Sequence, residues 1–382
     1  MPGRRRTGSA FVAAFAAAAL FFDAGLGLVV PGTPQKTAPR ANFSVLGTVI
    51  RYIKNDYLEE PDPKKTMEGA FQGLVNSLDV LSGYLDKAGA AKAANPHKLL
   101  LKDVGLILFK RYGAFPLVIG IVENSPAEKA GIQIGDYLSA VDDRSILVWS
   151  LSEINLSLKD MNPAPVKLRI IRGGSTKDIQ TDRASIYPKA LTMSAQSGTA
   201  GVLKIHHFYP PLVSEFKKSV LPRVRAIRAP LVLDLRNCHE GELEEARSFL
   251  NLFLKAERAG FFEKRAGAKE DFTLPGEALL EKLPVIVWVN QATMGPAEIV
   301  AADLRDFKRA KIVGIETPGL TAKQELFRLE SGDALLLSTG VFCLNSGEKV
   351  WNKGVSPDVK LDLDKTETKF YLEKTLALVS GR

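Results

Sequence analysis

Residues 124–142 read N-S-P-A-E-K-A-G-I-Q-I-G-D-Y-L-S-A-V-D, and they decide the fold of the first half of the chain. Ser125 is placed to cap a short helix that begins with a proline and carries Glu128 at its third position, which is a capping box. Gly131 ends that helix, because glycine tolerates the left-handed backbone of a helix terminus. The stretch therefore predicts a helix, a turn at Gly135 and a strand, in that order.

Apolar runs on both sides extend this stretch to a small β-rich module over residues 98–186. We expect one strand at 117–122 and another at 166–171. A second capping box at Ser150 opens a helix between them, whose apolar face holds Leu151, Ile154 and Leu158.

Residues 187–366 alternate strands with helices, a rhythm that is typical of an α/β core. The apolar runs have the length and continuity of buried parallel strands. The expected strands are 231–235, 284–289 and 312–314, and the expected helices are 243–254 and 297–307. Before the module, residues 41–97 show helical periodicity and predict a helical cap segment, and residues 367–382 predict a C-terminal helix.

The N-terminus has the pattern of a targeting segment. Three arginines at residues 4–6 precede an apolar stretch from Ala10 to Val30, and a short linker follows up to residue 40. This pattern predicts either a cleaved signal peptide or an uncleaved membrane anchor. In both cases the remainder of the chain is exported, so we expect a periplasmic or membrane-anchored protein.

Composition excludes several classes of function. The chain has 382 residues, 46% of them hydrophobic, and a net charge of +8, about half of which lies in the N-terminal 40 residues. The sequence has no basic stripe with interleaved aromatic residues, so we do not expect it to bind nucleic acid. The two cysteines, Cys238 and Cys343, form no metal-binding cluster, and whether they pair is left open. We expect no metal and no cofactor.

Several motifs together resemble the carboxyl-terminal (tail-specific) processing peptidases. The module resembles the PDZ domain of that family, and three core segments carry the rest of the resemblance. They are L-V-L-D-L-R-N at 231–237, A-E-I-V-A-A-D-L-R-D-F-K-R-A-K-I-V-G at 297–314 and W-N-K-G-V-S-P-D-V at 351–359. The resemblance implies a multidomain protein of α/β and β structure: a helical cap, a PDZ-like β module and a ββα-type core of the ClpP/crotonase kind.

The resemblance also implies a serine–lysine dyad, and this sequence departs from it at both positions. The family's nucleophile turn, S-A-S-A-S-E, aligns with Thr293-Met294-Gly295-Pro296-Ala297-Glu298, which places Gly295 where the serine attacks. The family's T-F-G-K-G-S-V-Q aligns without a gap from Thr317 to Gln324, which places Leu320 at the lysine. Glycine has no nucleophile and leucine accepts no proton. Gln324 is retained at the place of a family residue that supports the dyad.

The oxyanion loop departs from the family as well. The family's N-N-P-G-G aligns with residues 237–241, so Cys238, His239 and Glu240 stand before Gly241. An oxyanion hole needs backbone N–H groups directed at the developing negative charge. We expect the Glu240 carboxylate to oppose that charge and its Cβ to restrict the backbone.

The PDZ resemblance implies a groove for peptides. Its carboxylate-binding loop aligns with Val104, Gly105 and Leu106, whose backbone N–H groups would hold a terminal carboxylate. Leu151, Ile154 and Leu158 would form the helical wall of the groove. The expected partners are protein C-terminal tails or a partner protease, with a homo- or hetero-oligomer as a further option. The alternative is that Gly105 serves only a turn and another part of the chain seals the groove.

The chemistry could also have moved to neighbouring residues. The candidates are Thr293 as nucleophile, Lys323 as base, the pair Cys238 and His239, and the histidines His206 and His207. The leading hypothesis is a catalytically inactive serine peptidase homologue, a pseudoenzyme that acts as an exported peptide-binding scaffold or regulator. The alternative is an active serine-type endopeptidase with relocated catalytic residues.

Overall fold

The computed structural model describes residues 44–380, with gaps at 96, 188, 197, 200 and 226–228. The expected signal or anchor at 1–40 lies outside the described residues. The chain divides after Phe71 into two compact units. Helix α2 (Ser44–Asp56) belongs to the first unit, and helix α3 (Pro63–Asn76) runs across the division. Within the described residues, no helix is both long and apolar enough to cross a bilayer.

Residues 41–97, predicted as a helical cap segment, also contain a strand, so that prediction is wrong in part. Strand β1 (Gly83–Leu85) pairs antiparallel with β16 (Ala334–Leu344) and is followed by helix α4 (Lys87–Ala94). All three residues of β1 are buried, so their backbone groups need partners, and the sheet supplies them. A strand of three residues is too short to show alternation in the sequence.

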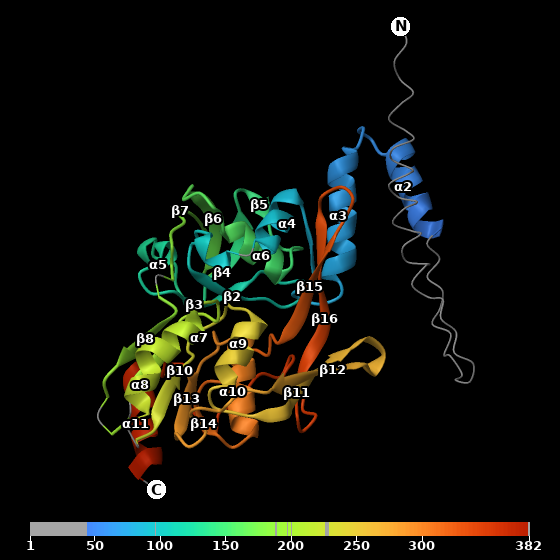
Figure 1. Ribbon diagram of the computed structural model, residues 1–382. Coiled ribbons are helices and arrows are strands. Elements are labelled where there is room, and N and C mark those ends of the chain that lie inside the picture. The colour runs from blue at the N-terminus through green and yellow to red at the C-terminus, as the bar shows by residue number, and fades with distance from the viewer. Residues whose placement is uncertain are drawn as a thin grey trace, which may run out of the picture. The chain divides into compact units, whose positions relative to one another are not determined.

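The β-rich module has the predicted elements (Figure 1). Its strand order is β2-β3-β4-β6-β7, with β5 paired to β4. The strands are β2 (Leu106–Phe109), β3 (Leu117–Ile121), β4 (Tyr137–Val141), β5 (Arg144–Ser145), β6 (Val166–Arg172) and β7 (Ser175–Thr181). A short 3-10 helix, η1 (Lys98–Leu100), precedes them. Helices α5 (Pro126–Lys129) and α6 (Leu151–Leu158) begin at the predicted caps, Ser125 and Ser150.

The core contains a six-stranded sheet in the order β17-β14-β13-β10-β9-β8, in which only β8 is antiparallel to its neighbour. The strands are β8 (Leu191–Ser194), β9 (Val202–Ile205), β10 (Leu231–Asp234), β13 (Val285–Val289), β14 (Ala310–Gly314) and β17 (Val359–Lys360). Strands β10, β13 and β14 are the three predicted from their apolar runs. Apart from the exposed Lys311 of β14, their side chains are buried, as expected for parallel strands covered on both faces.

Helices cover both faces of this sheet. One face packs against helices that precede and follow the strands: α7 (Leu212–Glu215), the π-helix η2 (Phe216–Val220), α8 (Leu221–Val224), α9 (Leu243–Leu250) and α10 (Pro296–Asp306). The other face packs against the C-terminal helix α11 (Thr368–Ser380), which includes the buried Tyr371. The Tyr371 hydroxyl donates to the Val289 carbonyl at 3.0 Å, and the Trp288 Nε1–H donates to Thr375 at 2.8 Å. Two buried hydrogen bonds therefore fasten α11 to β13.

A second sheet, in the order β1-β16-β11-β12 with β15 also paired to β16, completes the core. Its other strands are β11 (Ala256–Lys264), β12 (Lys269–Leu274) and β15 (Ala322–Arg328), and the turn η3 (Arg265–Gly267) joins β11 to β12. Both cysteines are buried free thiols. Over the described ranges, no group of histidine, cysteine, aspartate and glutamate side chains is arranged to hold a metal ion.

One buried carboxyl on α10 works against stability. Asp303 is fully buried, and neither of its carboxyl oxygens has a hydrogen-bond partner among the described residues. Burial raises the pKa of this carboxyl well above its usual range, so it is held protonated. A group with a raised pKa in the folded state favours folding most below its pKa in the unfolded chain, about 3.9 for aspartate. That contribution is lost as the pH rises.

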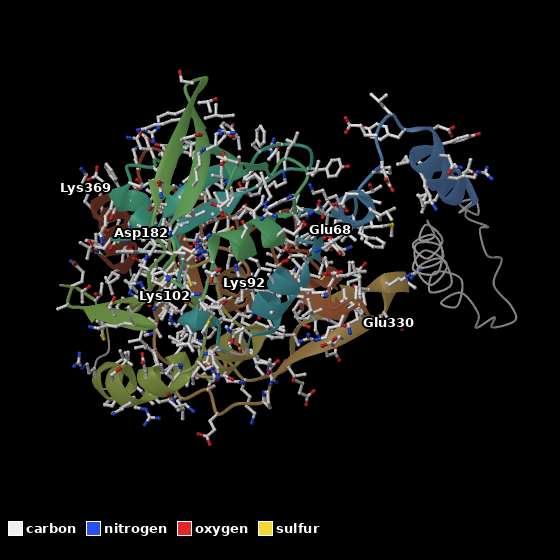
Figure 2. The ribbon with its side chains drawn as sticks, turned by 90° about the horizontal axis from the view of Figure 1, so that it is seen from above. Glu68, Lys92, Lys102, Asp182, Glu330 and Lys369 are labelled. Carbon is white, nitrogen blue, oxygen red and sulfur yellow. The ribbon has the colours of Figure 1, made fainter. Side chains whose placement is uncertain are left out.

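We predict that Asp303→Ala raises the free energy of unfolding at pH 7 by about 1–3 kcal/mol, since it removes an unsatisfied buried polar group. Urea unfolding should show a larger gain at pH 7 than at pH 4, where the unfolded chain also binds the proton. The same change at the exposed Asp182, labelled in Figure 2, should alter stability by less than about 0.5 kcal/mol. A gain that is equal at both pH values would contradict this account of Asp303.

Candidate functional site

Residue 295 lies where β13 turns into α10, and its backbone has an unusual conformation. Gly295 caps α10 with φ of 59° and ψ of −122°. This conformation is strained for residues with a side chain, and strand-to-helix turns of this kind present a nucleophile at the top of a sheet. A Cβ built on Gly295 would meet only the Leu320 carbonyl oxygen, at 3.8 Å. The turn therefore has room for a side chain but carries none.

Pro296 removes a second component of a nucleophile turn. In such turns the backbone N–H of the residue after the nucleophile donates to the oxyanion. Pro296 is the first residue of α10, where a proline fits well, but it has no N–H to donate.

Glu298 holds the site together, and sequence reasoning had used it only to fix the alignment. Its buried carboxylate accepts the N–H groups of Gly295 at 3.0 Å, Gly319 at 2.6 Å and Leu320 at 2.8 Å, together with the Thr317 hydroxyl. Burial raises the pKa of Glu298 to about 7, although these four donors oppose the rise. One side chain thus ties the nucleophile position to the base position. The signal in the sequence was a glutamate at the third position of a helix.

Leu320 lies in an apolar cluster that belongs mainly to the β-rich module. Its side chain is 7% exposed and shares that cluster with Met294 and Ala292 of the core. Gln324 lies on β15 and donates to the Leu81 carbonyl at 3.1 Å and to the Ser152 hydroxyl at 3.3 Å. It therefore braces α6 and the turn before β1, and no described contact joins it to the dyad positions.

The predicted oxyanion loop follows β10 and is tied to the loop before α10. Asn237 donates its N–H to the Asn290 side chain at 3.0 Å, and the Cys238 carbonyl accepts the N–H of Met294 at 3.0 Å. Gly241 packs so closely on Phe208 that a Cβ would lie 2.3 Å from the Phe208 Cβ. These hydrogen bonds hold the loop and the nucleophile turn side by side, as the family's chemistry requires.

We expected the Glu240 carboxylate to oppose an oxyanion, and this expectation is wrong because the carboxylate is paired with a lysine of the β-rich module. This carboxylate forms an ion pair with Lys159, which caps the C-terminus of α6 in the β-rich module. Burial opposes ionisation, but Lys159 holds the pKa of Glu240 below its usual range. The Lys159 Nζ atom also lies 3.5 Å from a carboxylate oxygen of Asp103. The charge of Glu240 is therefore neutralised from the module.

The other candidate nucleophiles and bases are engaged elsewhere. The Thr293 hydroxyl is buried, donates to the Leu235 carbonyl at 2.8 Å and accepts the Asn290 N–H at 3.0 Å. Lys323 pairs with Glu270 at 2.6 Å. Burial raises the pKa of the Cys238 thiol, which makes it a poor nucleophile.

The histidines are also committed to structure. The His239 Nδ1 atom lies 3.2 Å from the Asn237 carbonyl and 3.4 Å from the Tyr187 hydroxyl. His207 is buried and accepts the Tyr209 N–H at 3.1 Å, and burial lowers its pKa to about 4. His206 lies 3.1 Å from the Thr192 hydroxyl, on the neighbouring strand. The His206–Thr192 contact does bring an imidazole to a hydroxyl, but it lies at the β8–β9 edge of the sheet, whereas residue 295 follows β13.

The predicted peptide groove is closed in this structure. The side chains of Val104, Leu106, Leu151, Ile154 and Leu158 are each less than 5% exposed and belong to the module's core cluster. Gly105 has φ of +88° and donates its N–H to the Asp103 carboxylate at 2.8 Å. A peptide can reach these residues only if neighbouring elements move. Lys92 of α4 (Figure 2) is one such neighbour, because it donates to the carbonyls of Leu156 at 3.4 Å and Lys159 at 2.5 Å.

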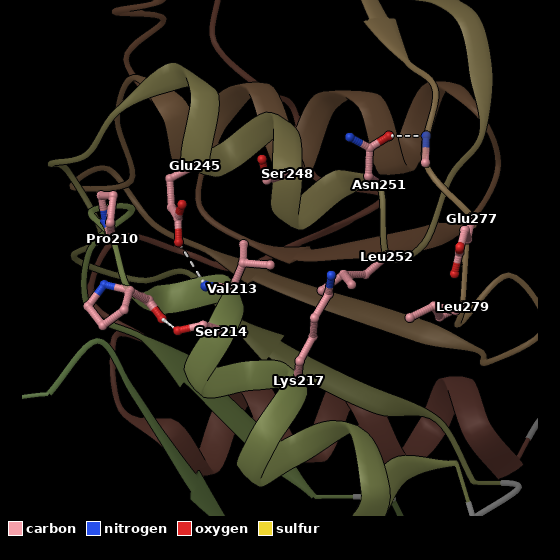
Figure 3. Close-up of a pocket in the computed structure, with 12 residues that line it drawn as sticks. Pro210, Val213, Ser214, Lys217, Glu245, Ser248, Asn251, Leu252, Glu277 and Leu279 are labelled. Atoms are coloured by element: carbon pink, nitrogen blue, oxygen red, sulfur yellow. Dashed lines mark hydrogen bonds between the residues drawn. The ribbon is translucent and has the colours of Figure 1, made fainter.

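A separate cavity of about 720 Å³ lies between α7, α9 and residues 275–280 (Figure 3). Lys217, Ser248 and Leu279 are among its lining residues. Glu245 and Asn251 also line it, but each is engaged in a backbone hydrogen bond, to Val213 and Gly276 respectively, at 2.8 Å. Residues 295 and 320 do not line it, so this cavity is distinct from the predicted site.

Comparison with known proteins supports the family resemblance that the sequence motifs indicated. Residues 199–361 match the model of Peptidase family S41, and residues 117–172 match the PDZ domain model. The chain is 27% identical over 352 residues to "Carboxy-terminal processing protease CtpA" of Bacillus subtilis, covering 91% of this chain and 75% of that one. It is 26% identical over 332 residues to "Probable CtpA-like serine protease" of Staphylococcus aureus, covering 86% of this chain. The alignment spans 66% of that relative's length.

Among solved structures, the photosystem II D1 C-terminal processing protease superposes with a TM-score of 0.69. That match covers 88% of this chain and 91% of the other at 21% identity, so it establishes a shared fold. Family model, relatives and fold point the same way as the order of cap, PDZ module and α/β core. The chain belongs to the PDZ-containing carboxyl-terminal processing peptidase family.

Proposed function

We propose that this chain is a catalytically inactive member of the family. The observation that carries the proposal is Gly295, which keeps the turn of a nucleophile without a side chain. Leu320 takes the place of the base and lies in an apolar cluster, where it can neither accept nor hold a proton. Pro296 adds a third loss, because it removes an oxyanion donor. The alternative, an active endopeptidase with relocated residues, is disfavoured because each candidate group is engaged in other contacts.

The proposed role is that of an exported scaffold or regulator that binds peptide segments. PDZ domains bind peptides by adding them as a strand to a sheet edge, beside a loop that holds the terminal carboxylate. The proposed partners are protein C-terminal tails or a protease of the same family, and the proposed location is outside the cytoplasm, directed by the first 40 residues. Homo- or hetero-oligomers are compatible with this role. The basic and apolar N-terminus supports export, as either a signal peptide or an anchor.

We predict that the purified protein leaves casein uncleaved and that serine-directed covalent probes do not label it, because residues 295 and 320 supply neither nucleophile nor base. The test is a gel assay together with intact-mass analysis, with an active tail-specific protease as the positive control. Turnover that survives repurification and disappears in Thr293→Val or Cys238→Ala would show that catalysis had moved.

Restoring the dyad should give only a feeble enzyme. Gly295→Ser with Leu320→Lys supplies a hydroxyl and an amine, but Pro296 still provides no oxyanion donor. Losing one such donor lowers kcat by about 100- to 1000-fold. We therefore predict that adding Pro296→Ala raises kcat on a peptide substrate by about that factor. A double variant as active as an ordinary family member would refute this account of the turn.

Tail binding should be limited by Asp103, whose carboxylate already accepts the Gly105 N–H. A peptide's terminal carboxylate would bring a second negative charge to the same loop. We predict that Asp103→Asn tightens binding of a labelled degenerate peptide pool with free C-termini by about tenfold, measured by fluorescence polarisation. The amidated pool is the control and should change little. Equal effects on both pools would mean that this loop does not read terminal carboxylates.

A further inference from the structure

Three positions that differ from the family all contact the PDZ domain. The family has a glycine in the oxyanion loop where Glu240 stands, an alanine in the nucleophile turn where Met294 stands, and a lysine where Leu320 stands. Glu240 pairs with Lys159 of the PDZ domain, and Met294 and Leu320 join the PDZ apolar cluster. The three positions lie in separate segments of the core. Their shared contact with the PDZ domain is therefore not a consequence of closeness in the sequence.

The apolar half of this contact is close. Met294 is 5% exposed and Leu320 is 7% exposed. Beside them, a Cβ built on Gly120 of β3 would lie 2.9 Å from the Ala292 Cβ, so β3 lies directly on the loop before α10. Gln291 donates to the Ile119 carbonyl on the same strand at 3.2 Å. An alanine at 294 would remove most of this surface, and a lysine at 320 would place an ammonium group in it.

The charged half of the contact is buried as well. The side chains of Lys159 and Glu240 are each 14% exposed, and that of Asp103, 3.5 Å from the Lys159 Nζ atom, is 9% exposed. Removing one partner of a buried pair leaves an uncompensated charge in a poorly solvated place, which is strongly destabilising. A glycine at 240 would leave Lys159 with Asp103 as its remaining carboxylate partner among the described residues.

We propose that the former active site is now an interface that holds the PDZ domain against the core. The substitution at 320, which removed the family's base, is one of those that build this interface, and the substitutions at 240 and 294 lie in the oxyanion loop and beside the nucleophile position. The PDZ domain and the core therefore form one closed body, joined through Lys159 and the Met294–Leu320 surface. This inference deepens the proposed function, on which it rests for the loss of the catalytic residues: the scaffold presents a fixed surface.

A double-mutant cycle on the full chain tests the charged half. Lys159→Met should lower Tm by about 5 °C or more, because it leaves the buried carboxylate of Glu240 without its lysine. Glu240→Gln should lower Tm by a smaller amount, because Lys159 keeps Asp103 at 3.5 Å. The double variant should fall no further than the worse single variant. Lys167→Met and Asp178→Asn form the matched control, since that pair lies 3.1 Å apart at the PDZ surface with both side chains about 40% exposed. This control cycle should show almost no coupling. Additive effects in the Lys159–Glu240 cycle would overturn the proposal.

Hydrogen exchange of the same full chain tests the apolar half. Met294→Ala and Leu320→Ala lie in the core, yet they should raise exchange in β2 and β3 of the PDZ domain several-fold. Leu304→Ala, a buried change on α10 outside the PDZ cluster, is the control and should leave β2 and β3 unchanged relative to the core. Exchange confined to the core in all three variants would overturn the proposal. The activity assay is independent of these readouts. If the chain is inactive but its PDZ domain moves freely against the core, this inference is refuted and the proposed function is not.

Discussion

The structure of the site depends on the Glu298 carboxylate. It is fully buried, and a carboxylate in that environment is stable only if its oxygens are well provided with donors. Gly295, Thr317, Gly319 and Leu320 provide four of them. Because these donors come from both the nucleophile turn and the loop that carries the base position, one side chain fixes the distance between the two. The geometry of a dyad is thus maintained by a residue that takes no part in its chemistry.

If the chain is inactive as proposed, this division between geometry and chemistry explains how the fold persists without the reaction. The left-handed backbone at residue 295 is strained for a serine but favourable for a glycine, so the substitution relieves strain and leaves the turn intact. Leu320 replaces an amine that would need a desolvated pocket with a side chain that prefers one. Neither change removes a donor to Glu298, because residues 295 and 320 both donate through the backbone N–H. Fold alone therefore says little about activity, which resides in a few atoms.

Much of the fold could be predicted from local sequence. The caps at Ser125 and Ser150 and the apolar runs of β10, β13 and β14 are short-range signals, and the structure has these elements at the predicted places. Strand β1 could not be predicted, because its partner β16 lies some 250 residues further along the chain. The ion pair of Glu240 with Lys159 could not be predicted for the same reason, because Lys159 is 81 residues away, in another domain. Nor did the groove residues reveal that they are buried, since an apolar helix face suits a ligand and a core equally well.

If the chain is inactive as proposed, no group among the residues that the structure describes attacks a peptide carbonyl. Oxygen exchange tests it most directly, because an acyl-transfer site exchanges the carboxylate oxygens of a bound peptide with solvent even when no net cleavage occurs. Free-acid peptides would be incubated with the full chain in water enriched in oxygen-18 and then analysed by mass spectrometry. The account predicts no incorporation above the rate without protein. Incorporation proportional to protein concentration, and abolished by a single substitution such as Thr293→Val, would contradict it.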